Sequence, residues 1–261
     1  MSSTLPTALV TGASSGIGAT YADRLARRGH DLVLVARDVS RLDALAARLR
    51  AEAGVAVDVL PADLTAPGDL ARVEARLRDD ARIGVLVNNA GAAAHGGFAG
   101  ADVDALDRLI RLNVTAVTRL AAAAVPGFLA RGEGAIINIA SVLAVVPELP
   151  LGIYAATKAY VLSLSQALQA ELGPRGIYVQ AVLPAATRTA IWERSGRDVD
   201  SLVGVMEVGE MVDAALVGFD RRETVTLPSL PDVGQWEAFE AARATITQNF
   251  ANGHAAARYR A

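Results

Sequence analysis

Residues 7–18 read TALVTGASSGIG, an apolar run of strand length followed by a glycine-rich turn. Apolar residues at helical spacing then occupy 17–28, and Gly29 ends that stretch. A second apolar run, DLVLVA, follows at 31–36. This order of strand, tight turn, helix and strand predicts two parallel strands joined by a helix that packs on them.

The same alternation of apolar strands and helical stretches continues to residue 227. Further strands are predicted at 55–60, 83–87, 135–140, 178–183 and 224–227. Further helices are predicted from 40 past 49, and at 65–81, 102–130, 152–172 and 206–219. Near-continuous apolar strands indicate a parallel sheet covered on both faces. Right-handed crossovers then favour one doubly wound, Rossmann-type α/β domain over 1–261, with seven strands in the order 3-2-1-4-5-6-7.

Polar residues before the helical stretches predict where these helices begin. Ser40 is placed to cap the second helix, and Thr65, with Pro67 just inside, opens the third. Asp102 is placed to cap the long fourth helix, which we expect to bend at Pro126.

The composition fits a globular protein and excludes several classes. Of 261 residues, 52% are apolar and 20% are charged, and the net charge of −3 offers no basic face for nucleic acid. The uncharged apolar stretch 134–147 is too short for a membrane span. The absence of cysteine removes thiol nucleophiles, and the three histidines lack the spacing of a helical metal pair. Residues 1–6 carry no secretory signal pattern, so we expect a cytoplasmic protein. Together, these observations predict no metal site and no nucleic-acid or membrane partner.

One basic residue differs from all the others. Of the 25 lysines and arginines, 24 are arginine, and the single lysine is Lys158, four residues after Tyr154. Codon bias explains the arginines but not the remaining lysine. Lysine is the compact cation whose pKa its surroundings can move, so position 158 has a chemical requirement that arginine does not meet.

The turn at 11–18, TGASSGIG, has the glycines that a dinucleotide pyrophosphate requires. Gly12 permits a tight turn, Gly16 lets the backbone approach the anion, and Gly18 lets the helix pack closely on the strand. Free N–H groups at the helix start then face the phosphates. The turn residues predicted to bind the cofactor are Gly12, Ser14, Ser15, Gly16, Ile17 and Gly18.

Residues at the ends of the second and third predicted strands indicate which nicotinamide cofactor binds. Arg37 follows Ala36 at the position where a guanidinium pairs with a 2′-phosphate and an acid binds ribose hydroxyls. Arg37 therefore predicts NADP(H) over NAD(H), and Asp38 argues the other way unless it caps the following helix. Asp63 and Leu64 are placed to hydrogen-bond and flank adenine, or else form only a polar strand end.

Tyr154 and Lys158 are four residues apart on one predicted helix, so both side chains can point into the same cleft. A free phenol has a pKa of about 10, too high for proton transfer at neutral pH. A nearby ammonium and an oxidised nicotinamide ring both favour phenolate, so we expect a lowered pKa for Tyr154. Tyr154 would then exchange a proton with a carbonyl oxygen. Ser141, after the fifth strand, can hydrogen-bond that oxygen or simply cap its own loop.

Five motifs stand in one order along the chain: 11–18, Asn88-Asn-Ala-Gly91, Asn113, Ser141 and Tyr154-x-x-x-Lys158. This order resembles the short-chain dehydrogenase/reductase family over about residues 7–189, close to three-quarters of the chain.

The resemblance implies further roles for several residues. Lys158 would also hold the nicotinamide ribose hydroxyls, and Asn113 would help to hold a water that links Lys158 to solvent. A local helix irregularity is the alternative for Asn113. The resemblance assigns Asn89, Ala90 and Gly91 to the nicotinamide side of the cofactor site. It also implies a homo-oligomer, a tetramer or dimer, built through the two long helices near 102–130 and 152–172.

The sequence departs from the family pattern after the sixth strand, where Pro184-Ala185 replaces the usual Pro-Gly. The methyl group of Ala185 changes how the backbone can pass the carboxamide. Thr187 and Thr189 follow at positions expected to meet the carboxamide or the pyrophosphate. Pro184, Ala185, Thr187 and Thr189 are therefore predicted cofactor residues.

The substrate side is predicted to be mostly apolar, with 187–205 resembling the family's substrate loop. The expected walls, beside Ser141 and Tyr154, are His95, Phe98, Leu143, Leu149, Leu151, Ile191, Trp192 and Val203. They favour an uncharged, apolar ketone or aldehyde. Arg188 and Arg194 support an alternative, since either can bind a carboxylate. His95 fits a loop position better than a catalytic one.

Residues 230–261 leave the alternating pattern and form a predicted helical extension. Asp232 with Gln235 resembles a capping box. One helical face then carries Trp236, Phe239, Ile246 and Phe250. We predict that this face packs on the chain's own core; a lid over the substrate cleft and an oligomer contact are the alternatives.

The sequence predicts an NADP(H)-dependent carbonyl reductase or alcohol dehydrogenase with a small-molecule substrate. Its predicted catalytic residues are Asn113, Ser141, Tyr154 and Lys158. Two alternatives stay open: an NAD-dependent alcohol dehydrogenase of the same family, and a non-catalytic dinucleotide-sensing regulator.

Overall fold

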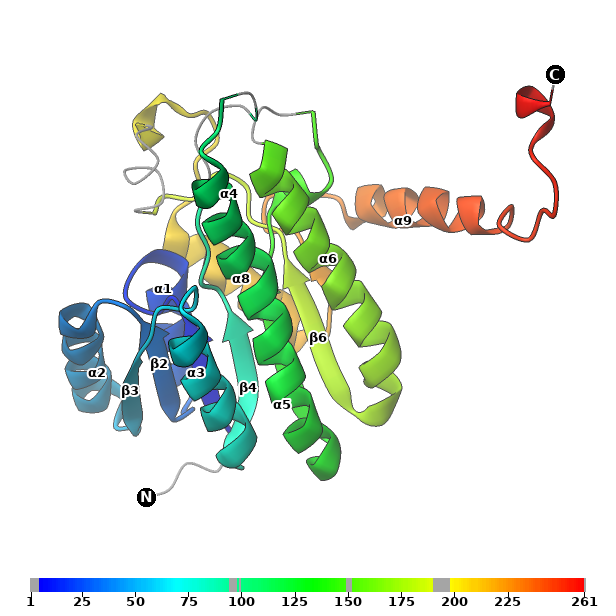
Figure 1. Cartoon of the computed structure of the whole chain (residues 1–261). Helices are drawn as coiled ribbons and strands as arrows, with labels where there is room; N and C mark the ends of the chain where they lie inside the picture. Colours follow the sequence, from blue (N-terminus) through cyan, green and yellow to red (C-terminus); the bar gives the residue numbers. More distant parts are fainter. Residues whose placement is uncertain (1–4, 94–97, 99, 149–151, 190–197, 261) are drawn as a thin grey trace. The chain divides into compact units, whose positions relative to one another are not determined.

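The computed structural model describes residues 5–93, 98, 100–148, 152–189 and 198–260. The chain divides into two compact units, Met1–Pro228 and Ser229–Ala261. The first unit contains a seven-stranded parallel sheet in the order β3-β2-β1-β4-β5-β6-β7, which confirms the predicted doubly wound fold (Figure 1). A single domain over the whole chain stays a prediction.

The strands lie within two residues of their predicted positions. They are β1 (Thr7–Thr11), β2 (Leu32–Ala36), β3 (Val57–Pro61), β4 (Ile83–Asn88), β5 (Gly134–Ile139), β6 (Ile177–Val182) and β7 (Val225–Thr226). β1, β2, β4, β5 and β6 are almost wholly buried, which is why their sequences read as continuous apolar runs.

Helices cover both faces of the sheet and form two apolar cores. The helices are α1 (Gly16–Arg27), α2 (Val39–Ala53), α3 (Pro67–Asp79), α4 (Val103–Ile110), α5 (Val117–Arg131), α6 (Gly152–Leu172) and α8 (Val208–Asp220). One core joins α1, α2 and α8 to the sheet, and the other joins α3, α5 and α6 to it. Neighbouring strand residues belong to opposite cores: Val10 faces the first and Leu9 the second.

Two of the predicted helix caps are wrong, and one is confirmed. Asp38, not Ser40, precedes α2, and its side chain accepts a hydrogen bond from the Arg41 N–H at 3.0 Å. Ala66 precedes α3 without a side-chain cap, because the Thr65 hydroxyl instead donates to Asp63 at 2.7 Å. Asp102 caps α4 as predicted, accepting from the Asp104 N–H.

The long predicted helix is interrupted before its proline. α4 ends at Ile110, a π-helical segment η1 (Arg111–Ala116) follows, and α5 then runs through Pro126 to Arg131. By length and composition alone Val103–Arg131 is apolar enough to cross a membrane. Its buried residues belong to the core beneath the sheet, which accounts for that apolarity. The expectation of no membrane span stays a prediction.

The second unit contains α9 (Val233–Thr247) and a short helical turn, η5 (Ala257–Tyr259). Asp232 caps α9, accepting from the Gly234 N–H at 2.9 Å. Trp236 and Phe239 stack with ring centroids 5.2 Å apart. Within this unit α9 has no buried residue. The packing of this face on the chain's own core stays a prediction.

A tyrosine hydroxyl lies inside the first core with no hydrogen-bond partner among the residues that the structure describes. Tyr21 on α1 is fully buried, and no donor or acceptor of the described residues bonds its hydroxyl oxygen. Burial raises the pKa of Tyr21 far above its ordinary value, so the phenol stays neutral. An unsatisfied buried hydroxyl opposes folding because water bonds it in the unfolded chain.

We expect Tyr21→Phe to stabilise the protein by about 1 kcal/mol, since only the unpartnered hydroxyl is lost. The urea midpoint measures the change. Tyr178→Phe is the matched control, because the Tyr178 hydroxyl donates to the Glu223 carbonyl oxygen at 2.6 Å and its loss should destabilise. A lower midpoint for Tyr21→Phe contradicts the prediction.

Candidate active site

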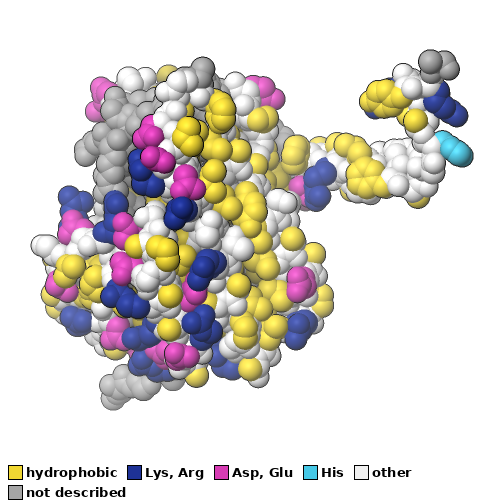
Figure 2. Space-filling model, in the orientation of Figure 1, with side chains coloured by type: hydrophobic (Ala, Val, Ile, Leu, Met, Phe, Trp, Pro, Cys, Tyr) yellow, Lys and Arg dark blue, Asp and Glu magenta, His cyan; other side chains and the backbone are white. Residues whose placement is uncertain are grey.

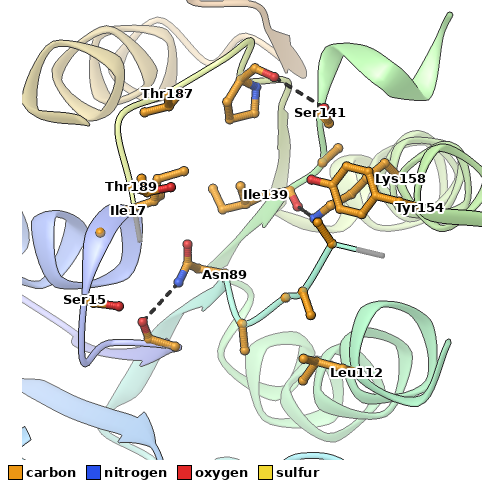
Figure 3. Close-up of a pocket in the computed structure, with 18 of the residues that line it drawn as sticks. Ser15, Ile17, Asn89, Leu112, Ile139, Ser141, Tyr154, Lys158, Thr187 and Thr189 are labelled. Atoms are coloured by element: carbon orange, nitrogen blue, oxygen red, sulfur yellow. Dashed lines mark hydrogen bonds between the residues drawn. The ribbon is translucent and has the colours of Figure 1, made fainter. Parts of the chain in front are cut away.

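A cleft of about 730 Å³ opens at the carboxyl ends of the strands. The loops after β1 to β6 each contribute to its walls, as expected for a doubly wound sheet. Every cofactor residue predicted from the sequence lines it except Gly18. Figure 3 shows part of this lining, with Ser15 and Ile17 on the side opposite Tyr154 and Lys158.

The glycine-rich turn has the backbone shape predicted for it. Gly12 has φ +66° and Gly16 has φ +54°, in the left-handed region that side chains disfavour. A Cβ on Gly12 would lie 2.7 Å from the Asn89 amide nitrogen. One on Gly18 would collide with the Gly12 carbonyl oxygen and with Asn89. Gly18 thus acts by close packing, and the space over the turn stays open to the cleft.

The start of α1 offers unpaired N–H groups to this cleft. Ser15 occupies the N-cap position, and its side chain makes no capping hydrogen bond. Ser14, Ser15, Gly16 and Ile17 all line the cleft. Backbone donors at a helix N-terminus attract an anion, so this end of the cleft suits a phosphate group.

Asn89 holds the turn and the end of β4 together. Its side-chain amide donates to the Thr11 carbonyl oxygen at 2.8 Å. The Thr11 hydroxyl oxygen in turn accepts from the N–H groups of Asn89 and Ala90 at 2.9 and 3.0 Å. These contacts of Thr11 could not be predicted from the sequence, because an ordinary threonine at a strand end carries no signal of long-range contacts.

The two charged residues that follow β2, Arg37 and Asp38, differ in whether they already have partners in the described part of the chain. Asp38 caps α2 and also pairs with Arg41 at 3.3 Å. Arg37 is exposed and lines the cleft, and no hydrogen bond or ion pair engages it within the described part of the chain. Asp63 also lines the cleft, and its carboxylate accepts from the N–H and hydroxyl of Thr65. Leu64 lies beside it.

Lys158 is buried on α6, and its ammonium donates to the Ile139 carbonyl oxygen at 2.8 Å. Burial lowers the pKa of Lys158 to about 8. Its Nζ atom lies 5.6 Å from the ring centroid of Tyr154, which is also drawn in Figure 3. The two side chains therefore share one end of the cleft, as their spacing predicts.

The lowered pKa expected for Tyr154 beside an oxidised nicotinamide ring stays a prediction. Burial raises the pKa of Tyr154 to about 12, and a hydrogen bond with Ser141 offsets only part of that rise. Lys158 directs its ammonium at a backbone carbonyl rather than at the phenol oxygen. Desolvation therefore outweighs the neighbouring cation, and Tyr154 carries its proton at neutral pH.

Asn113 lies in the π-helical segment η1, behind the cleft wall rather than on it. Its carbonyl oxygen accepts from the Ala92 N–H at 3.0 Å. Its amide donates to the Ala92 carbonyl oxygen at 2.9 Å and to the Thr157 hydroxyl at 3.1 Å. Both amide protons of Asn113 are thus committed to the protein. The predicted irregularity of the helix is present, and Asn113 links three segments through it.

Thr157 is a second residue whose role the sequence did not indicate. It is buried beside Lys158, accepts from Asn113, and donates to the Tyr154 carbonyl oxygen at 2.8 Å. A threonine next to the lysine has no distinctive spacing, so only the fold shows that it faces Asn113.

Ser141 lines the cleft and also caps its own loop. Its hydroxyl oxygen accepts from the Leu143 N–H at 3.2 Å, at the start of the short helix η2 (Val142–Ala144). Its hydroxyl lies 3.5 Å from the Pro184 carbonyl oxygen, as drawn in Figure 3. The two roles considered for Ser141 are therefore compatible. Ala185 lines the cleft with its backbone in contact with Thr187, whose hydroxyl donates to the Ala185 carbonyl oxygen at 3.0 Å.

The described walls beside Tyr154 are largely apolar. The apolar lining residues include Val142, Leu143, Leu202 and Val203. Phe98 is exposed and does not line the cleft. The predicted substrate residues His95, Ile191 and Trp192 lie outside the described residues, as do Leu149, Leu151 and Arg194.

The alternative role for Arg188 is not supported. Its guanidinium already pairs with Asp200 at 2.6 Å and with Glu207 at 2.8 Å, so it is not available for a substrate carboxylate.

Comparison with known proteins places this arrangement in a family. The family model for short chain dehydrogenases matches residues 6–200. The chain therefore belongs to the short-chain dehydrogenase family, and it is an oxidoreductase.

Two solved structures resemble nearly the whole chain. A short-chain dehydrogenase from Sphingobium yanoikuyae in complex with NADPH is 64% identical, with a TM-score of 0.97 over 98% of this chain and 100% of that one. A bulky-bulky ketone specific alcohol dehydrogenase from Comamonas testosteroni is 55% identical, with a TM-score of 0.92 over 98% of this chain and 99% of that one.

Curated relatives are more distant and longer. The very-long-chain 3-oxoacyl-CoA reductase of Anas platyrhynchos is 38% identical over 182 residues, which are 68% of this chain and 58% of that protein. The chain thus matches less than two thirds of that relative's length.

Proposed function

We propose that this protein is an NADPH-dependent reductase of uncharged, apolar ketones, which also runs in reverse on secondary alcohols. One observation carries the proposal: a single cleft has exposed Arg37 at one end, with no ion pair or hydrogen bond to it from the described residues, and converging Ser141, Tyr154 and Lys158 at the other. The NADPH bound to the relative from Sphingobium yanoikuyae supports the choice of coenzyme.

The described residues fit NADPH along the whole cleft. Gly12 and Gly16 leave room where side chains would fill it, and the uncapped start of α1 suits the pyrophosphate. Arg37 is available for a 2′-phosphate because Asp38 is engaged as a helix cap. When bound, NADPH supplies the hydride for carbonyl reduction.

The chain's own residues handle the proton and the oxygen. Tyr154 keeps its proton at neutral pH, which is the form that can donate it to a carbonyl oxygen during reduction. Ser141, hydrogen-bonded with Tyr154, can hold that same oxygen. Lys158, whose pKa is about 8, can accept or return a proton near neutrality and can hold ribose hydroxyls. Asn113 and Thr157 keep the helix that carries the pair in place.

The substrate end favours apolar ketones over charged thioesters. Apolar Val142, Leu143 and Val203 line the cleft, and Arg188 is held by two carboxylates. A coenzyme A thioester carries several phosphates and needs cations that are free to pair with them. The bulky ketone specificity named for the relative from Comamonas testosteroni supports the same choice.

The expected homo-oligomer and the cytoplasmic location remain parts of this proposal. Hydrophobic side chains gather over α5 and α6 on the face seen in Figure 2. Ile110 at the end of α4 and Tyr160 on α6 are exposed, which supports an association through these helices.

Arg37→Ala should raise the KM for NADPH by about tenfold to a hundredfold and leave the KM for NADH nearly unchanged, because one charge-assisted contact to the 2′-phosphate is lost. Initial rates with each coenzyme at a fixed ketone concentration measure this. Arg41→Ala is the matched control on the same helix end. Equal losses with both coenzymes would favour the NAD-dependent alternative.

Tyr154→Phe should keep NADPH binding and lose about a hundredfold to ten-thousandfold in kcat, because the ring remains and the transferable proton does not. Coenzyme fluorescence titration and single-turnover rates separate the two effects. Unchanged turnover in this variant contradicts the mechanism. Wild-type protein that binds NADPH but reduces no carbonyl compound favours the dinucleotide sensor.

Across a carbonyl panel we expect the highest kcat/KM for ketones with large apolar groups, and lower values for keto acids and 3-oxoacyl-CoA thioesters. The apolar walls and the paired Arg188 are the reason. Loss of NADPH absorbance measures each rate. A clear preference for the thioester or for keto acids overturns the substrate assignment and leaves the reaction class standing.

A further inference from the structure

We propose that Arg188 is a positioning residue that sets substrate size selectivity by fastening the segment 198–207 beside the substrate end of the cleft. This inference rests on the proposed reduction of apolar ketones. In this inference the guanidinium of Arg188 binds two carboxylates of the protein and not a carboxylate of the substrate.

The guanidinium of Arg188 fastens both ends of this segment. Its Nη1 atom donates to Asp200 Oδ1 at 2.6 Å, in the short helix η4 (Val199–Ser201). Its Nε atom donates to Glu207 Oε1 at 2.8 Å, immediately before α8. One side chain therefore bridges the beginning and the end of the segment.

Backbone hydrogen bonds add a second, weaker attachment at one end only. The Arg188 N–H donates to the Met206 carbonyl oxygen, and the Met206 N–H donates to the Ala186 carbonyl oxygen, both at 2.9 Å. The end near Asp200 has no such backbone bond to 186–188 among the described residues. Its attachment to the cleft wall thus depends on the Arg188–Asp200 ion pair.

Two apolar residues lie between the fastened ends. Leu202 and Val203 both line the cleft. Val203 is 99% exposed, although burying a valine is favourable. A large apolar ligand that covers such an exposed side chain removes much apolar surface from water. This burial stabilises the complex with the ligand. The position of this pair therefore decides how well a bulky group is held.

The size of the substrate should determine how much it depends on this attachment. A ketone with a large group on each side of the carbonyl reaches Leu202 and Val203. A small ketone held at Ser141 and Tyr154 depends on them less. Exposed ion pairs are individually weak and are screened by salt, so the effect on selectivity is a modest factor.

The first test compares amide hydrogen exchange in the wild type, Arg188→Gln and Arg76→Gln. Arg76 is the matched control, because it also pairs with two carboxylates, Asp58 and Asp80, and does not line the cleft. We expect faster exchange within 198–207 in Arg188→Gln alone, and the same change in wild type at high salt. Exchange in 198–207 that equals wild type in Arg188→Gln overturns the proposal.

The second test measures NADPH-dependent kinetics with acetone and with a diaryl ketone. In Arg188→Gln the ratio of kcat/KM for the diaryl ketone to that for acetone should fall about three- to tenfold, through KM rather than kcat. Arg188→Lys should restore part of the ratio, and Asp200→Asn should reproduce the loss. Equal losses for both ketones, or a changed KM for NADPH, overturn the selectivity role. If the wild-type protein reduces neither ketone, the proposed function is wrong. The hydrogen-exchange result then still decides whether Arg188 holds the segment 198–207 in place.

Discussion

The hydrogen bond from the Lys158 ammonium to the Ile139 carbonyl oxygen is the contact on which the catalytic end of the cleft depends. A buried ammonium requires an acceptor, and this one belongs to the last residue of β5. The bond therefore ties α6 to the sheet at one point. Tyr154, one helical turn before Lys158, then faces the loop after β5, where Ser141 begins η2. Ser141, Tyr154 and Lys158, at most 17 positions apart in sequence, meet at the end of α6 that this bond joins to β5.

A second set of buried polar contacts joins the same helix to η1. Asn113 uses both amide protons and its carbonyl oxygen on Ala92 and Thr157, so the loop after β4, the π-helical segment and α6 are joined at one residue. Polar groups buried in this way stabilise a structure only when all are satisfied. Buried polar contacts also lie within the sheet, where Asn88 donates to Asn138 and Asn138 donates to Ser165 on α6. The contacts of Asn113 differ from these because they hold the part of α6 that carries Tyr154 and Lys158.

The fold follows from the sequence because its signals are regular. Continuous apolar strands, glycines at Gly12, Gly16 and Gly18, and the Tyr154–Lys158 spacing each depend on local chemistry. The features that sequence reasoning missed depend on distant partners. Whether Asp38 or Ser40 caps α2 is settled by backbone geometry, and the raised pKa of Tyr154 reflects burial that no motif encodes. Arg188 presents the same charge in the sequence whether it meets a substrate or two protein carboxylates.

The π-helical segment η1 also constrains how the length of this chain can change. A π-helical turn closes its hydrogen bond one residue further along the chain than an α-helical turn, so losing one residue between Arg111 and Ala116 would leave an ordinary α-helical turn between α4 and α5. The wide turn that directs the Asn113 amide to Ala92 and Thr157 would be lost with that residue. Substitutions at exposed positions of this helix can accumulate one at a time, whereas an insertion or deletion here has to be compensated at once. The number of residues in this wide helical turn is therefore constrained, as well as its shape.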